Sequence, residues 1–334
     1  MTPASSTDSP QHPRPAGLAQ PGWLEPMLAT LTRERFADPG WIFERKLDGE
    51  RCLAFRSGAR LRLMTRNQKE VTGTYPELAA ALGAHQPAAD FIVDGEVVAF
   101  DGEQTKFARL QQRLGVRDPG PELRAEVPVY FYIFDVLWAG GRDTRPLPLR
   151  ERKRLLRGLL SYGGPLRFTE HRDTDGEAYW REACAQGWEG LVAKRADAPY
   201  RPGRSRDWLK FKCEAGQEFV IGGYTDPQGS RTGFGALLLG YYDAGGQLIY
   251  AGKVGTGFDQ HTLTSLHAAL AELERDQPAF DRGALPRSRV HWVEPRLVGE
   301  VGFSEWTQDG QLRHPRFQGL RRDKDATEVV REAG

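Results

Sequence analysis

The stretch Trp41–Phe55 constrains the fold of this chain more than any other part of its sequence. Bulky apolar residues at Trp41 and Phe43 share one face of an extended chain, and the charged residues Glu44 and Lys46 share the other. Successive side chains of a strand point to opposite faces, so this pattern predicts a strand with one apolar and one charged face. The folded part of the chain is therefore expected to contain a β-strand that ends at a lysine.

The residues after Lys46 predict a tight turn and a second strand. Asp48-Gly49 is a typical turn pair, and a new apolar stretch runs from Arg51 to Phe55. The lysine thus has an acid, a glycine and an arginine beside it. A lysine becomes a good nucleophile when burial or nearby cations lower its pKa. A solvated hairpin with ordinary surface charges is the alternative interpretation of this stretch when it is taken alone.

The length of 334 residues is enough for two domains, each with its own core. No apolar run is long enough to span a membrane, and the N-terminus lacks the pattern of a signal peptide.

Cys52, Cys184 and Cys213 are odd in number, and no two form a CxxC pair. The cysteines therefore argue against a disulfide framework and a zinc site, and fit a reducing cytoplasm. With a net charge of +1, any nucleic-acid binding has to come from local basic patches.

Periodicity divides the chain into three parts. Residues 1–22 are rich in Pro, Ser, Thr, Gln and Ala and predict a disordered tail. Residues 23–214 predict a first domain of strands and helices. Its further strands are expected at 60–66, 91–93, 97–100, 127–137, 188–195 and 207–212, and its helices at 75–84, 106–114, 150–160 and 175–186. Between two of these strands, Asp94-Gly95-Glu96 is expected to form an acidic turn at a cleft edge, or else a plain surface turn.

The expected domain boundary is Glu214-Ala215-Gly216, and residues 217–334 predict a second domain. Short strands are expected at 218–224, 236–242, 248–253, 291–298 and 301–306, with a helix at 262–274. Five strands with an inserted helix are typical of a small Greek-key barrel of the OB type. The fold class expected for the whole chain is α+β.

Seven segments that carry charged or aromatic residues resemble, in their order, the motif set of the covalent nucleotidyltransferases. This superfamily contains the ATP-dependent DNA ligases, RNA ligases and mRNA capping enzymes. The segments are Lys46–Arg51, Thr65–Asn67, Asp94–Glu96, Phe134-Asp135, Glu189–Lys194, Trp208–Lys212 and Arg321–Lys324. Four further stretches resemble, more narrowly, the ligase module of bacterial end-joining enzymes of the ligase D type: Phe107–Arg113, Ile221–Gly229, Tyr250–Phe258 and Arg313–Leu320. The resemblance implies an α+β fold: a nucleotidyltransferase (adenylation) domain with antiparallel sheets and flanking helices, followed by a β-barrel OB-fold domain.

The chemistry that this resemblance implies is three successive phosphoryl transfers, in which the protein mainly positions groups and neutralises charge. A lysine takes AMP from ATP, passes it to the 5′-phosphate at a nick, and the 3′-hydroxyl then displaces it. The implied cofactors are ATP and Mg²⁺ or Mn²⁺. The residues implied as catalytic are Lys46 as nucleophile, Asp48 beside it, Lys210 and Lys212 at the α-phosphate, and Arg321, Asp323 and Lys324 at the pyrophosphate.

The resemblance also implies nucleotide and metal contacts. Phe134 is expected to stack on adenine, and Lys210 and Lys212 to lower the pKa of Lys46 by like-charge proximity. The remaining contacts expected are Glu44 to adenine, Arg51 to ribose or phosphate, Arg66 to the 5′-phosphate of the nick, Arg204 to the nucleotide, and Glu96 and Glu189 to ribose or a metal ion. A domain closure about residues 214–216 is expected to bring the segment Arg321–Lys324 to the nucleotide.

The implied substrate is nicked or broken duplex DNA, and the implied role is DNA repair or end joining. A Ku-like end-binding protein and separate polymerase and nuclease proteins are the partners that such a role suggests. We expect a monomer in the bacterial cytoplasm, associated with the nucleoid when bound to DNA. The alternatives are an RNA ligase or GTP-using capping enzyme, and a non-catalytic OB-fold binder of nucleic acid, which would form no covalent AMP.

Overall fold

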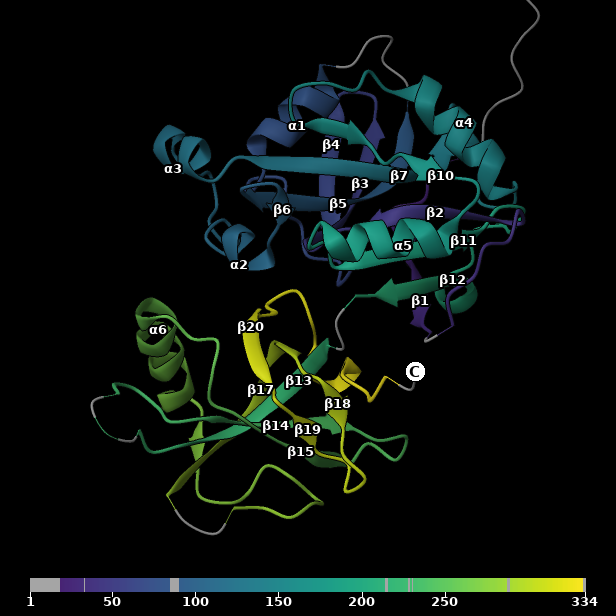
Figure 1. The fold of residues 1–334 in the computed structure, drawn as a ribbon. Coiled ribbons are helices and arrows are strands. Elements are labelled where there is room, and N and C mark those ends of the chain that lie inside the picture. The colour runs from purple at the N-terminus through teal and green to yellow at the C-terminus, as the bar shows by residue number, and fades with distance from the viewer. Residues whose placement is uncertain are drawn as a thin grey trace, which may run out of the picture.

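A computed structural model of the chain describes residues 19–32, 34–84, 90–213, 216–227, 229, 231–286 and 289–332. Two bodies follow one another along the chain (Figure 1), an N-terminal one up to residue 213 and a C-terminal one from residue 216. Most of the predicted tail, residues 1–18, lies outside the described residues. Just after it, the Gln20 side chain donates hydrogen bonds to the carbonyls of Arg56 and Phe91, both at 2.9 Å. No helix in the described ranges is long and apolar enough to cross a membrane.

One sheet of the N-terminal body contains the predicted lysine-bearing strand. Its five strands lie in the order β1 (Met27–Leu31), β12 (Gly203–Lys212), β11 (Gly190–Arg195), β2 (Trp41–Lys46) and β10 (His171–Arg172). The β1–β12 pair is parallel and the other pairs are antiparallel. As predicted, Trp41 and Phe43 are buried on one face, where they pack with Leu209 and Phe211. The other face of β2 carries Glu44 and Lys46 together with Ile42, which is buried against Leu149 and Ala196.

The second sheet of this body contains the most apolar stretch of the chain, the predicted strand at 127–137. The strand order is β4 (Arg60–Thr65), β3 (Glu50–Ser57), β5 (Phe91–Asp101), β7 (Val129–Ala139) and β8 (Arg142–Asp143). In addition, β6 (Gln104–Thr105) pairs with β5, and β9 (Leu166–Phe168) runs parallel to β7. With neighbours on both edges, β7 can bury its apolar side chains in the main core of the body.

Two local predictions for these sheets are wrong. The stretch around Lys46 is not a hairpin, because β2 and β3 belong to different sheets and Asp48-Gly49 joins the two. At Gly49 a Cβ would lie 2.2 Å from the carbonyl oxygen of Val97, so the close approach of the backbones excludes any larger residue. The Asp94–Glu96 segment is not a turn either. It lies inside the continuous strand β5, where the register shifts between Asp94 and Gly95.

The helices of the N-terminal body lie outside its sheets. They are α1 (Pro76–Gly83), α2 (Phe107–Leu110), α3 (Pro121–Glu126), α4 (Leu149–Leu159) and α5 (Gly176–Ala185). Helix α5 covers the apolar face of the five-stranded sheet (Figure 1), with Tyr179 and Ala183 in the same cluster as Phe43. Helix α4 is strongly basic, but Arg152 points inward and its guanidinium binds both carboxylate oxygens of Asp135 at 2.7 and 2.9 Å. That pair ties the helix to β7.

The C-terminal body is built around one curved sheet. Its strands are β15 (Leu248–Val254), β14 (Leu237–Tyr242), β13 (Gly216–Thr225), β17 (Val290–Gly302) and β16 (Glu274–Arg275), with β20 (Arg316–Leu320) also paired to β17. A small ribbon of β18 (Glu305–Trp306) and β19 (Leu312–Arg313), the helix α6 (Gln260–Ala271) and the short helix η1 (Ala326–Glu328) complete it. The division predicted between strands at 291–298 and 301–306 is wrong, since β17 runs unbroken through the first range and ends at Gly302, just inside the second, whose last two residues form β18.

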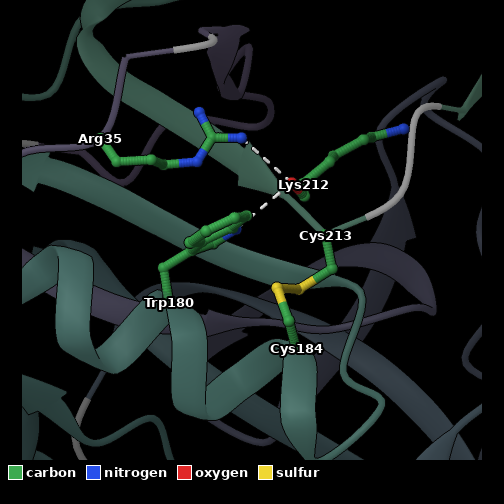
Figure 2. Close-up of a disulfide and its surroundings, with 5 residues drawn as sticks. All are labelled: Arg35, Trp180, Cys184, Lys212 and Cys213. Atoms are coloured by element: carbon green, nitrogen blue, oxygen red, sulfur yellow. Dashed lines mark hydrogen bonds between the residues drawn. A yellow bond between two sulfur atoms is a disulfide. The ribbon is translucent and has the colours of Figure 1, made fainter. Parts of the chain in front are cut away.

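The prediction that the cysteines form no disulfide is also wrong. Cys184, in α5, is bonded to Cys213, the residue after β12 (Figure 2). The same strand end is held by Arg35 and Trp180, whose side chains donate to the carbonyl of Lys212 at 3.1 and 3.3 Å. The two cysteines are 29 residues apart, so no short motif predicts their pairing. Cys52 is buried and free.

We expect the disulfide to stabilise the N-terminal body. The double variant Cys184→Ser/Cys213→Ser should lose about 3 kcal/mol of unfolding free energy, because a crosslink over a loop of this length restricts the unfolded chain. Urea unfolding with and without dithiothreitol measures the effect. The reductant should weaken the unaltered protein by a similar amount and leave the double variant unchanged. An unaltered protein that is insensitive to the reductant would contradict the prediction.

Candidate active site

The two bodies meet at a cavity of about 510 Å³. Its lining includes thirteen of the fourteen residues that the sequence predicted for the site: Glu44, Lys46, Asp48, Arg51, Arg66, Glu96, Phe134, Glu189, Arg204, Lys210, Arg321, Asp323 and Lys324. Lys212 is the exception, although its ammonium lies 3.9 Å from a carboxylate oxygen of Glu189, which does line the cavity. Residues from almost the whole length of the chain therefore surround one space.

Strand register explains how the lysines come together. Lys46 on β2 pairs with Gly190 on β11, and Gly190 pairs with Lys212 on β12, so the three residues form a row across the sheet. Gly190 has no room for a side chain, because a Cβ there would lie 2.0 Å from the carbonyl oxygen of Phe211. One step along, Val192 lies between Glu44 and Lys210 in the same way.

Lys46 is protonated in this arrangement. Its ammonium lies 2.5 Å from a carboxylate oxygen of Glu189. Burial and the nearby Lys212 lower the pKa of Lys46, but the attraction of Glu189 outweighs them and the net direction is upward. The expected lowering of the Lys46 pKa by neighbouring lysines is therefore reversed while Glu189 is its partner.

Glu44 is a buried carboxylate on β2, two residues before Lys46, and it also lines the cavity. Its two oxygens bind the ammonium groups of Lys153 and Lys194 at 2.7 and 2.6 Å. Burial alone would raise the pKa of Glu44, but the two lysines outweigh it and lower the pKa. Glu44 therefore stays negative at the cavity wall, and the lysines keep it from being an uncompensated buried charge.

An aromatic wall lies next to Glu44. Phe134 and Trp208 meet edge to face with ring centroids 6.0 Å apart, and the ammonium of Lys194 lies 4.1 Å from both centroids. Arg51 lies 4.5 Å above the Phe134 ring and is fixed there by both oxygens of Asp94, at 2.5 and 2.6 Å. An aromatic surface beside hydrogen-bonding groups is suited to a heterocyclic base.

The carboxylates of the cavity fit a metal ion that also binds oxygens of a bound phosphate. Glu189 has one oxygen on Lys46, and its other oxygen is buried with no hydrogen-bond partner among the described residues. Burial raises the pKa of Glu96 to about 7, so a nearby cation would favour its charged form. No cluster of three or more metal-ligating side chains occurs among the described residues. Mg²⁺ commonly uses one or two carboxylates and takes its other oxygens from phosphates and water.

The segment Arg321–Lys324 reaches the cavity from the C-terminal body. Arg321 binds both oxygens of Asp323 at 2.9 and 2.8 Å, and its guanidinium lies 4.3 Å above the ring of Phe107. Asn67 donates to the carbonyl of Asp323 at 2.9 Å, so this segment contacts the N-terminal body directly. Lys324 lies 3.1 Å from Glu218. The segment lines the same cavity as Lys46 although the two are far apart in sequence.

Several residues at the site were not predicted from the sequence. Lys194 was seen only as the end of a motif, yet it is the buried partner of Glu44. Glu300 on β17 lies 3.6 Å from both Lys212 and Arg321, and so links the two bodies. Glu328 and Glu332 line the cavity from the end of the chain. Only Lys194 had a sequence signal, a cation near the end of an apolar strand. The acids lie in stretches with no distinctive pattern.

Comparison with known proteins agrees with this geometry. The model of the ATP dependent DNA ligase domain matches residues 26–212, and that of the ATP dependent DNA ligase C terminal region matches residues 230–324. The chain belongs to the ATP-dependent DNA ligases. The predicted pairing of a nucleotidyltransferase domain with an OB-fold domain is confirmed by a solved structure of mycobacterial DNA ligase D complexed with ATP and MES. It matches with a TM-score of 0.66 and 36% identity, over 92% of this chain and 98% of that one.

Relatives of this ligase include larger proteins. The multifunctional non-homologous end joining protein LigD of Pseudomonas aeruginosa is 38% identical over 324 residues, which is 93% of this chain and 37% of the relative. A DNA ligase of Methanocorpusculum labreanum is 30% identical over 297 residues, 86% of this chain and 52% of the relative. The chain thus spans about two fifths of the length of the LigD relatives it matches.

Proposed function

We propose that this ligase seals nicks with a 3′-hydroxyl and a 5′-phosphate in duplex DNA, through lysyl-AMP and adenylated DNA, in repair or end joining. The observation that carries the proposal is the meeting of Lys46, Lys210 and the segment Arg321–Lys324 around one cavity. An amine nucleophile, a cation for the phosphate that it attacks and cations for the leaving group are what nucleotidyl transfer to lysine requires.

In the first step the Nζ atom of Lys46, after losing its proton, attacks the α-phosphorus of ATP. A nitrogen–phosphorus bond forms, the bond to the bridging oxygen breaks, and pyrophosphate leaves. Phe134 and Glu44 hold the adenine, while Arg51, Arg204 and Glu96 contact the rest of the nucleoside. Lys210 and Lys212 neutralise the α-phosphate, and Arg321, Asp323 and Lys324 orient the pyrophosphate in line with the nucleophile.

The next two steps use the same centre. An oxygen of the 5′-phosphate attacks the phosphorus of lysyl-AMP, and Lys46 leaves as an amine. The 3′-hydroxyl then attacks the 5′-phosphorus, AMP leaves and the strand is sealed. Arg66 holds the 5′-phosphate at the nick. Mg²⁺ or Mn²⁺, held by Glu189 and Glu96 with phosphate oxygens, would neutralise charge that builds up on the phosphoryl group.

The test is incubation with ATP labelled in the α-phosphate, followed by addition of a nicked duplex. The label should first appear on the protein and then leave it as the nick is sealed. Parallel incubations with labelled GTP and NAD, and with a nicked RNA duplex, distinguish a DNA ligase from an RNA ligase or capping enzyme. Absence of labelled protein with every nucleotide would instead support a non-catalytic binder of nucleic acid.

The proposal also covers domain organisation and cellular location. The adenylation domain is residues 23–214 and the OB-fold domain is residues 217–334. The protein is a monomer in the bacterial cytoplasm that associates with the nucleoid when it is bound to DNA. Double-strand end joining with a Ku-like protein and separate polymerase and nuclease proteins is the role that the LigD relatives suggest, since they are multifunctional non-homologous end joining proteins.

A further inference from the structure

The last described residues of the chain, Asp325–Glu332, enter the cavity between the two bodies. Of this segment, Glu328, Val329, Val330 and Glu332 line the same space as Lys46. The segment follows directly after the pyrophosphate-facing residues, but none of the motifs recognised in the sequence includes it. It contributes two carboxylates to a cavity whose other walls carry the cations that we assign to phosphates.

Glu332 pairs with Lys210, the lysine assigned to the α-phosphate. Both side chains are largely buried, at 11% and 14% exposure. Burial alone would raise the pKa of the Glu332 carboxyl, but Lys210 and Lys212 outweigh it and lower the pKa, so the carboxylate is charged. Its second oxygen is buried and has no hydrogen-bond partner among the described residues.

Glu328 pairs with Arg66, the arginine assigned to the 5′-phosphate of the nick. The Arg66 side chain is 17% exposed, whereas Glu328 is 48% exposed and reaches it from the surface. Two carboxylates, four residues apart, therefore form ion pairs with two cations that bind different phosphates in the proposed reaction.

The segment is anchored on the C-terminal body and not on the cations alone. The amide of Tyr242 donates to the carbonyl of Val329 at 2.7 Å, and Val329 itself is 5% exposed in an apolar cluster with Val220 and Tyr250. Gln217 holds the end of the segment by accepting a hydrogen bond from the amide of Glu332 at 3.0 Å. The backbone that carries the two carboxylates is thus held in place by the C-terminal body.

We propose that Glu332 and Glu328 act as internal phosphate substitutes, which occupy Lys210 and Arg66 until ATP and the nicked DNA displace them. The inference rests on the proposed function, because it uses the roles assigned there to the two cations. A tethered carboxylate has a high effective concentration and competes with a free ligand although its own contact is weak. A triphosphate carries more charge and more acceptor oxygens, so it can displace a single carboxylate.

The two carboxylates also lower the energetic cost of the unoccupied site. A buried cation without a partner is costly, and Lys210 would be one in the absence of nucleotide. Because the segment belongs to the C-terminal body, moving that body away from the N-terminal one removes both carboxylates together and exposes both cations to DNA. Occupation of the cations is thereby linked to the relative position of the two bodies.

The test compares Glu332→Gln and Glu328→Gln, which keep the shape of the side chain and the anchoring of the segment. Lys46 is first freed of AMP with excess pyrophosphate. The rate of lysyl-AMP formation is then measured against ATP concentration, and sealing by adenylated protein against nick concentration. We expect Glu332→Gln to lower the half-saturating ATP concentration by about threefold to tenfold at low salt. We expect Glu328→Gln to lower that of the nicked duplex and to leave that of ATP within about twofold.

Glu122→Gln is the matched control, since Glu122 is exposed on α3 and does not line the cavity. It removes the same charge and should change neither value. Unchanged or raised half-saturating concentrations in both test variants would overturn the inference. Calorimetric titration with an ATP analogue that has a methylene group between the α- and β-phosphorus needs no catalysis. It tests the Glu332 arm even if no lysyl-AMP forms, an outcome that would overturn the proposed function separately.

Discussion

Replacing Lys46 by alanine should leave a folded protein that takes up no label from α-labelled ATP. Only an amine at this point of the cavity can form the nitrogen–phosphorus bond. The other lysines near it are held by further groups: Lys210 binds Glu332, and Lys212 donates to the carbonyl of Gly216 at 2.6 Å. Lys46→Arg should give the same result, because the guanidinium group stays protonated and is a poor nucleophile. Gel separation of the labelled protein measures the loss.

Lys253→Ala is the control for this experiment. Lys253 is an exposed residue of β15 outside the cavity lining, and its loss should leave label uptake unchanged. The removal of Lys46 also leaves Glu189 without its nearest cation, so circular dichroism should confirm that the variant is folded. Label retained by Lys46→Ala on another residue would refute the assignment of the nucleophile.

Loss of Arg321 or Asp323 should abolish the formation of lysyl-AMP but leave the final sealing of adenylated DNA intact. Arg321 donates two hydrogen bonds to Asp323 and lies near Glu300. Arg321→Ala therefore removes, and Asp323→Ala releases, the guanidinium that we assign to the leaving pyrophosphate. Formation of lysyl-AMP should fall below detection. Sealing of a nick that already carries AMP on its 5′-phosphate should continue, because no pyrophosphate takes part in that step.

The neighbouring Arg322 offers a matched control. It is exposed and does not line the cavity, so Arg322→Ala should still form lysyl-AMP at the normal rate. Normal adenylation by Arg321→Ala would refute the role in orienting pyrophosphate. Equal loss of adenylation and of sealing would point to a damaged fold or to lost DNA binding.

Local pattern predicted most elements of this fold, and its failures have a common cause. The alternation from Trp41 to Lys46 identified β2 and its buried face, but nothing in it says which sheet the next strand joins. The crossing at Asp48-Gly49 and the unbroken strand β5 follow from pairing with distant strands. The disulfide between Cys184 and Cys213 was missed for the same reason, since it depends on where α5 lies against β12.

The cavity was predictable as far as the family motifs extend. Thirteen residues chosen from those motifs do line it, from Glu44 to Lys324. The partners of the motif residues were not predictable, because a partner needs only the right charge at the right place. Lys153, on a helix that reads as a solvated basic face, lies buried against Glu44. Glu332 pairs with Lys210 from the end of the chain, where the sequence has no distinctive pattern.

The disulfide has a consequence for how far the two bodies can separate. Cys213 is bonded covalently to α5, and only Glu214 and Ala215 lie between it and the start of β13 at Gly216. Three Cα–Cα steps span at most about 11 Å. The C-terminal body is therefore tethered closely to a strand end that the disulfide fixes. It can make room for a duplex by rotating about the end of β12, but not by moving away from that point. In such a rotation, the loops farthest from the end of β12 move the most.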